Sequence, residues 1–248
     1  MMNGPGFPPS APIPEFEDGD VAQMGERYVR NVQAGGSIPP ISTINPIRNF
    51  MADQKYRKAL INRETRETKI RLKLELDGKG ISRIQSPVPF LNHMLELMSY
   101  HGSLNLELKA KGDIEVGFHH TVEDIGLCLG DAFKECWGDL KGVNRYGEAL
   151  LPMDEALVLI AVDISRRPHL SYGWKPQKVR VEGFDSALVK EFFQALVNRA
   201  GLTLHLQVLA GENIHHIIEA MFKGFGRAIR QAGLLQKRTT VLSTKGIL

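Results

Sequence analysis

Four of the eight histidines fall into two copies of one short motif, His-His-x-x-Glu. The two copies are His119, His120 and Glu123, and His215, His216 and Glu219. On a helix, the glutamate follows the first histidine by four residues and the second by three, so the three side chains crowd one end. Imidazole together with carboxylate suits Mn, Fe, Zn or Ni and excludes none of them. The spacing therefore predicts metal binding.

The geometry of a helix limits what one motif can do. Adjacent residues diverge by about 100° around the helix axis, so one motif cannot easily close around a single ion, although it can supply ligands to two. Two such helices would build two sites, each with two histidines and a glutamate. A lone histidine pair is usually a surface accident. Here the pair occurs twice, each time at an expected helix start, and both copies recur with a repeat of the surrounding elements. This favours metal sites instead.

The same repeat nominates further ligands. His93 lies nine residues before Gly102, and its counterpart in the second half falls close to Glu191, ten residues before Gly201. His205 is the alternative, on the polar face of an expected strand. A histidine in that setting is as often a structural hydrogen-bonding residue. We therefore prefer Glu191 over His205.

Hydrophobic periodicity predicts the elements that carry these residues. In 69–76, alternation puts four apolar residues on one face of a half-buried strand: Ile70, Leu72, Leu74 and Leu76. The predicted elements of the first half are strands 69–76, 81–86 and 103–110, a helix from Pro89 to Gly102 and a helix over 119–138. Those of the second half are strands 157–164, 169–174 and 202–209, and helices 185–201 and 214–232. Asp185 or Ser186 is the expected N-cap of the first of these helices, and Asn213 that of the second.

The order strand, strand, helix, strand, helix thus occurs twice. Gly102 and Gly201 are 99 residues apart and the motif copies 96 apart, which indicates an internal duplication. We expect an α+β fold of two repeats, at about 63–140 and 155–235, each a small sheet with helices on one face, followed by a C-terminal tail. Residues 1–62 are rich in Pro and Gly with scattered acids, so we expect a largely disordered extension.

Composition excludes several other classes of protein. The net charge of +3 and 7% aromatic residues give little support for nucleic-acid binding. Cys128 and Cys136 form no CxxC pair, which argues against a disulfide scaffold or a thiolate zinc site and favours a reducing compartment. No run of 18 apolar residues predicts a membrane span. A cytoplasmic location is the expectation.

Several segments resemble the signature segments of the imidazoleglycerol-phosphate dehydratase family. They are FLNHMLELMSYHG, HHTVEDIGLCLG, GVNRYGEALLPMDEAL, DISRRP, AGLTLH, ENIHHIIEAMFK and STKGIL. The resemblance runs from about Arg63 to Leu248. It implies a duplicated fold similar to the second domain of ribosomal protein S5 and two Mn ions per active site. It also implies a shell of 24 subunits, with the sites formed between neighbours.

The resemblance also implies roles for single residues. The implied metal ligands are His93, His119, His120, Glu123, His215, His216 and Glu219, and Glu191 stands where many relatives have a histidine. Of these, His93, His119, Glu123 and His215 would also contact the substrate. The implied phosphate contacts are Arg145, Arg167, Lys223, Ser243 and Lys245, a set whose charges suit a phosphate dianion. Glu67 matches a family glutamate near the substrate.

The implied reaction removes water from imidazole glycerol phosphate to give imidazole acetol phosphate. The departing proton sits on a carbon with no adjacent carbonyl, so the ring must help, and we expect two metals to hold it as imidazolate. Glu67 is the expected acid/base group, with Asp154 and Glu155 as second candidates. One alternative is a metal-dependent hydrolase of a small phosphorylated molecule, which would release phosphate. Another is a metal-storage or shell-forming protein, which would not need the arginines and lysines.

Overall fold

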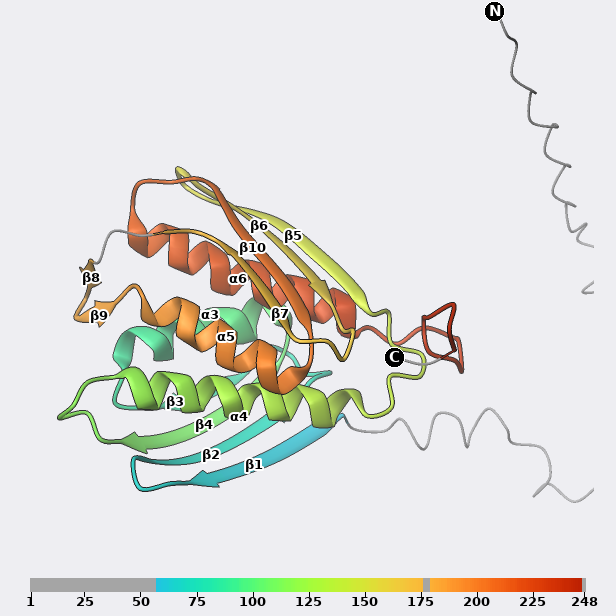
Figure 1. Ribbon diagram of the computed structural model, residues 1–248, viewed down its shortest axis with the longest axis horizontal. Coiled ribbons are helices and arrows are strands. Elements are labelled where there is room, and N and C mark those ends of the chain that lie inside the picture. The colour runs from blue at the N-terminus through green and yellow to red at the C-terminus, as the bar shows by residue number, and fades with distance from the viewer. Residues whose placement is uncertain (1–56, 176–178, 247–248) are drawn as a thin grey trace, which may run out of the picture. The chain divides into compact units, whose positions relative to one another are not determined.

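The computed structural model describes residues 57–175 and 179–246 (Figure 1). The predicted N-terminal extension, 1–62, lies outside the described residues except for its last six. Strand β1 (Lys58–Glu64) begins within those six and pairs with the next strand. The folded part therefore starts before residue 63, the boundary expected from the sequence.

The first half forms a four-stranded sheet with two helices. Its elements are β1, β2 (Thr68–Glu75), β3 (Ser82–Gln85), α3 (Pro89–Gly102), β4 (Asn105–Gly112) and α4 (His119–Trp137). The strand order is β1-β2-β4-β3, in which only β3 and β4 pair in parallel. The predicted inward face of β2 is confirmed, because Ile70, Leu72 and Leu74 are buried.

The second half repeats this arrangement. Its elements are β5 (Tyr146–Met153), β6 (Ala156–Asp163), β7 (His169–Gly173), α5 (Leu188–Ala200), β10 (Thr203–Ala210) and α6 (Ile214–Gly233). The strand order is β5-β6-β10-β7, and β7 and β10 are the parallel pair. A short hairpin, β8 (Arg180–Val181) with β9 (Phe184–Asp185), lies between β7 and α5. The equal strand orders confirm the predicted duplicated α+β fold.

Each four-stranded sheet has one edge strand that the sequence did not predict, β1 in the first half and β5 in the second, and the β8–β9 hairpin was not predicted either. The periodicity missed β5 because its inward positions are small: Gly147 and Ala149. A Cβ atom at Gly147 would overlap the carbonyl oxygen of Ala228 in α6. The close approach of this helix therefore removes the large alternating residues by which a strand is recognised.

The helix ends were predicted with mixed success. Asn213 caps α6 as expected, since its Oδ1 accepts hydrogen bonds from the backbone N–H of His215 at 2.9 Å and of His216 at 3.4 Å. The predicted caps of α5, Asp185 or Ser186, are wrong. The N-cap is Ala187, which has no side-chain cap, because the β8–β9 hairpin holds Asp185 in extended backbone before the helix begins.

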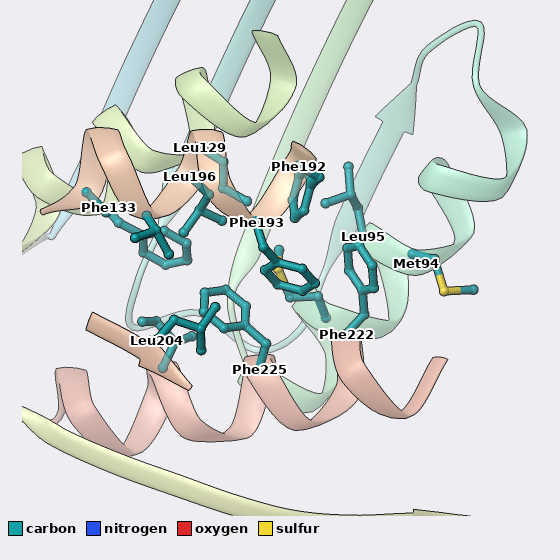
Figure 2. Packing of buried hydrophobic residues seen from close by; sticks show 14 of the residues in the cluster. Met94, Leu95, Leu129, Phe133, Phe192, Phe193, Leu196, Leu204, Phe222 and Phe225 are labelled. Atoms are coloured by element: carbon teal, nitrogen blue, oxygen red, sulfur yellow. The ribbon is translucent and has the colours of Figure 1, made fainter. Parts of the chain in front are cut away.

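The helices of both halves lie between the two sheets (Figure 1). Helix α3 packs against α6, and α4 against α5, so each pair joins one half to the other. Figure 2 shows phenylalanines from three helices meeting in this layer, among them Phe133, Phe193 and Phe225. The two repeats therefore share a single core. Within the described residues, no helix has the length and hydropathy that a bilayer crossing requires.

Candidate functional site

His93, His215 and Glu219 form a cluster suited to a metal ion, and we call it the α3–α6 trio. One potential ligand atom from each residue lies within 4.8 Å of the others. His215 Nε2 is 3.3 Å from Glu219 Oε2, and the rings of His93 and His215 are 6.1 Å apart. Two imidazoles and a carboxylate fit a divalent transition-metal ion. Within residues 57–175 and 179–246, this is the one group of three acidic, histidine or cysteine side chains gathered so closely.

The carboxylate of this trio is well prepared to stay ionised. Glu219 is nearly buried, and it forms an ion pair with Lys223, one turn further along α6. Burial alone would raise the pKa of Glu219, but the hydrogen bond from Lys223 and the nearby His215 outweigh it, and the pKa is lowered. The structure thus places Lys223 beside the metal candidate rather than with the other predicted phosphate contacts.

The other motif copy is more open. His119 Nε2 lies 3.7 Å from Glu123 Oε2, and both side chains are about half exposed. No third potential ligand in the described part of the chain comes as close to them as His93 comes to His215 and Glu219.

The packing of the helices shows where a third ligand belongs. In the α3–α6 pair, Gly226 lies against the carbonyl of Met98. In the α4–α5 pair, Gly130 lies in the same way against the carbonyl of Leu196. Each glycine is eleven residues after the first histidine of its motif, and Met98 is five residues after His93. Because Leu196 is five residues after Glu191, Glu191 occupies the position in α5 that His93 occupies in α3.

His205, the alternative to Glu191, lies elsewhere. It is exposed on β10, where its neighbours Leu204 and Leu206 face the helices and are buried. Since successive strand residues point to opposite faces, His205 faces away from the helix layer that carries both motifs. Its ring lies 6.0 Å from that of His169 on the same face of the sheet.

The second histidine of each motif is held by a carboxylate from outside the motif. His216 Nδ1 is 2.8 Å from Glu155 Oε2, and His120 Nδ1 is 2.9 Å from Asp113 Oδ2. In both cases the hydrogen bond raises the pKa of the histidine. Among the described residues neither ring joins a trio, in keeping with the divergence of adjacent residues around a helix.

Glu155 is itself firmly held. Its Oε1 accepts hydrogen bonds from the backbone N–H of Asn213 at 2.9 Å and of Glu212 at 3.3 Å. The hydrogen bond with His216 and these backbone donors lower its pKa to about 2. A carboxyl group that stays ionised at all moderate pH values is poorly matched to proton transfer near neutrality. The neighbouring Asp154 is 71% exposed and lies 3.9 Å from His216 Nδ1.

Four of the five predicted phosphate contacts gather at one place. A cavity of about 560 Å³ is lined by Arg145, Arg167, Ser243 and Lys245, and we call it the basic pocket. Arg145 holds the C-terminal tail there, since its Nη1 donates to the carbonyl of Leu242 at 2.7 Å. Its other nitrogens bind Asp163 at 2.6 and 3.0 Å, and this pairing raises the pKa of Arg145. Arg167 is 70% exposed at the pocket rim.

The metal candidates and the basic pocket lie at opposite ends of the same helices. The backbone N–H of Arg145 binds the carbonyl of Ala232, at the end of α6, and Arg166 contacts the carbonyl of Gly138, just after α4. Both motifs lie at the beginning of these helices. A helix rises about 1.5 Å per residue, so the 20 residues of α6 separate its ends by roughly 30 Å. One small molecule cannot reach both places in a single chain.

Two residues near the motifs were not predicted from the sequence. Asp113 holds His120, and Glu182, in the turn of the β8–β9 hairpin, lies 3.2 Å from His215 Nδ1. Neither stands in a motif or a periodic pattern, and both reach their histidine through loops that the sequence does not locate. The predicted Glu67 lies 3.9 Å from His120 Nδ1, beside the same motif.

Comparison with known proteins shows to which family the chain belongs. A family model described as imidazoleglycerol-phosphate dehydratase matches residues 86–229. The imidazoleglycerol-phosphate dehydratase of Geobacter sulfurreducens is 54% identical over 193 residues, which are 77% of this chain and 99% of that protein. The enzyme of Moorella thermoacetica is 55% identical over 193 residues, or 77% and 98% of the two chains. The chain belongs to the imidazoleglycerol-phosphate dehydratase family.

Solved structures of this family agree with the fold. Imidazoleglycerol-phosphate dehydratase of Staphylococcus aureus superposes with a TM-score of 0.66 at 40% identity, covering 72% of this chain and 99% of that one. The Pyrococcus furiosus enzyme, solved with (S)-C348, gives 0.66 at 37% identity, covering 76% and 100%. Membership of the family makes the chain a metal-dependent hydro-lyase of histidine biosynthesis.

Proposed function

We propose that the protein removes water from imidazole glycerol phosphate to give imidazole acetol phosphate. The observation that carries the proposal is the pairing of two kinds of site in one chain. The α3–α6 trio suits an ion that binds an imidazole ring, and the basic pocket suits a phosphate.

The proposed cofactor is a pair of Mn²⁺ ions. His93, His215 and Glu219 would hold one ion, and the equivalent Glu191, His119 and Glu123 would hold the other. His120 and His216 would complete these sites from neighbouring copies. When bound, the ions would supply the positive charge that stabilises the substrate ring as an anion.

The separation of the two sites supports an assembly of several copies. Because roughly 30 Å lies between the ends of α6, the basic pocket that binds the phosphate would come from a different copy than the metal ligands. The 24-subunit shell implied by the family resemblance would provide such contacts. The assembly is part of the proposal.

The chain's own side chains would then divide the work. Arg167, Ser243 and Lys245 would bind the phosphate, and Arg145 would keep the tail in place beside them. Glu67, next to His120 and about half exposed, would take up and deliver the protons. A carboxylate at this place fits general acid/base catalysis better than Glu155, which is occupied by three hydrogen-bond donors.

The direct test is an assay of the full-length protein, stripped of metal, with imidazole glycerol phosphate as substrate. Mn²⁺, Zn²⁺ or Fe²⁺ is added back in turn, and the ketone product and inorganic phosphate are both quantified. We expect no turnover without metal and ketone without phosphate once Mn²⁺ is restored. Release of phosphate would instead identify a hydrolase, and full turnover by the metal-free protein would refute metal dependence.

A further inference from the structure

The hairpin turns that open the two halves carry equivalent glutamates with different contacts. Glu67 is the residue before β2, and Glu155 is the residue before β6, the equivalent strand. Both turns reach the second histidine of the nearby motif. Glu155 Oε2 is 2.8 Å from His216 Nδ1, whereas Glu67 Oε2 is 3.9 Å from His120 Nδ1, too far for a hydrogen bond.

In the first half, Asp113 has taken the place of the turn glutamate. Its Oδ2 lies 2.9 Å from His120 Nδ1. Asp113 follows β4 directly, and its backbone N–H binds the carbonyl of Glu67 at 3.1 Å, so the two acids lie side by side. The contact with His120 is thus supplied from the connection between β4 and α4, and Glu67 is left without it.

The contact to Nδ1 decides what the opposite nitrogen of the ring can do. An imidazole that donates its Nδ1 proton to a carboxylate carries its free lone pair on Nε2, which is the form that binds a metal. The carboxylate also fixes the orientation of the ring. Glu155 is suited to this role because its other oxygen is fixed by two backbone N–H groups at the start of α6.

We propose that Glu155 and Asp113 are positioning residues that direct Nε2 of His216 and His120 toward metal ions, and that Asp113 thereby leaves Glu67 free for proton transfer. This inference rests on the proposed function. It assigns different roles to two acids that the duplication made equivalent. Glu155 acts through a histidine, and Glu67 acts on the substrate.

The test for Glu155 compares two variants that remove the same charge near the same helix end. Glu155→Gln loses the carboxylate that holds His216, while Glu212→Gln changes an exposed neighbour. Mn²⁺ affinity of the full-length protein is measured by equilibrium dialysis and elemental analysis. Loss of a residue that orients a metal ligand typically weakens binding 10- to 100-fold, so we expect a decrease of about tenfold or more for Glu155→Gln and an unchanged affinity for Glu212→Gln.

A parallel pair of variants tests the first half. Asp113→Asn should weaken Mn²⁺ binding by about tenfold or more, whereas Glu115→Gln in the same loop should not. Glu67→Gln should bind Mn²⁺ normally and lose turnover by about 100-fold or more. The absorption spectrum of the Co²⁺-loaded protein provides a second measurement. We expect Glu155→Gln and Asp113→Asn to change it and Glu67→Gln to leave it unchanged.

The possible outcomes separate this inference from the proposed function. Wild-type protein that binds no metal would refute the proposed function itself. If the wild-type protein binds Mn²⁺ and Glu155→Gln has the same Mn²⁺ affinity as Glu212→Gln, only the positioning role is refuted. Equal loss of Mn²⁺ affinity in Glu67→Gln and Asp113→Asn would refute the division of roles. If Glu155→Gln fails to fold, Glu155→Asp, which keeps the charge, replaces it and should bind Mn²⁺ more weakly because its shorter side chain cannot hold both sets of partners.

Discussion

Glu191 is the residue on which the equivalence of the two halves depends most. It is a carboxylate at the position where the first half has the imidazole of His93, and the two glycine contacts give both residues the same register. A carboxylate and an imidazole both bind Mn²⁺. The ion site that contains Glu191 would therefore have one more negatively charged ligand than the site that contains His93.

Replacing Glu191 tests this assignment. We expect Glu191→Ala to lose one of two bound Mn²⁺ ions, measured by elemental analysis after dialysis, and Glu191→His to keep both. His205→Ala is the control, because His205 faces away from the helix layer and should leave the metal content unchanged. If His205→Ala loses Mn²⁺ while Glu191→Ala keeps its full metal content, His205 and not Glu191 is the ligand.

The two buried cysteines lead to a prediction about thiol reactivity and about how stability changes with pH. Burial raises the pKa of Cys128 and of Cys136 to about 12, so at pH 8 their thiolate fraction is roughly a thousandfold below that of a free thiol. Iodoacetamide should therefore label them only after unfolding, as counted by intact-mass spectrometry. The unfolded thiols ionise from about pH 9 while the folded ones stay protonated, so the free energy of unfolding should fall as the pH rises above that value. Rapid labelling of the native protein at pH 8 would contradict the raised pKa.

At the scale of elements, the outer face of the first sheet carries like charges directly opposite each other. Lys69 pairs across strands with Lys111, and Arg71 with Lys109, on the exposed face of β2 and β4. Like charges in opposing positions destabilise a sheet. These two pairs therefore oppose the stability that the inward face provides, although Lys73 lies opposite Glu107 on the same strands and Lys69 forms an ion pair with Glu64.

Lys109→Glu should relieve this repulsion. It places a carboxylate opposite Arg71 and should raise the free energy of unfolding by about 0.2–1 kcal/mol, measured by urea unfolding at low salt. The gain should shrink at high salt because exposed charges are screened. Lys79→Glu makes the same charge change outside the strands, and an equal gain there would show that only the net charge matters.

The close contact of α3 with α6 gives a second prediction for an element. A Cβ atom at Gly226 would overlap the carbonyl of Met98, a backbone atom that cannot move alone. We expect Gly226→Ala to lower the free energy of unfolding by about 1–3 kcal/mol. Gly233→Ala, at the end of the same helix, would meet its nearest atoms at ordinary contact distances. It should be neutral or slightly stabilising, and similar losses in both variants would point to the helix backbone rather than to this contact.

The elements also show how far the sequence alone can lead. The repeated order of strands and helices, with the two motif copies 96 residues apart, predicted the duplicated fold, and Asn213 predicted the start of α6. The edge strand β5 was missed because a neighbouring helix requires Gly147 there. The sequence predicted that the first histidine and the glutamate of each motif lie close together at one end of a helix, since these residues repeat at a fixed spacing, and the structure places them 3.7 and 3.3 Å apart. It could not predict Asp113 as a partner of His120, because that contact depends on the path of a loop.

At the scale of the whole molecule, the separation of the candidate metal ligands from the basic pocket allows a test of whether active sites are shared between copies. Glu67→Gln removes the expected acid/base group at one end, and Arg167→Ala removes an expected phosphate contact at the other. Each variant alone should be nearly inactive. When the two are co-assembled at random, roughly a quarter of the sites would combine an intact Glu67 with an intact Arg167 from another copy. Activity should therefore return to about that fraction.

The control is the double variant, with both changes in one chain, co-assembled with wild-type protein. The activity of this mixture should not exceed the activity that its wild-type chains contribute, because the double variant supplies neither Glu67 nor Arg167. Absence of any recovery in the mixture of single variants would mean that each site is built within one chain. That result would contradict the proposed arrangement and would require the tail or the helices to move far from their observed positions.

The opposite placement of the two functional ends along α4 and α6 constrains how copies can join. A contact between the metal-ligand end of one molecule and the basic-pocket end of the next is heterologous, because it joins two different surfaces. Such contacts form a closed ring only when the rotation between neighbours returns to its starting point, and otherwise they continue as an open filament. The angle of that contact therefore decides between a closed particle and an open fibre. Substitutions at such a contact, even far from any ligand, should be judged by electron microscopy for filaments as well as by loss of turnover.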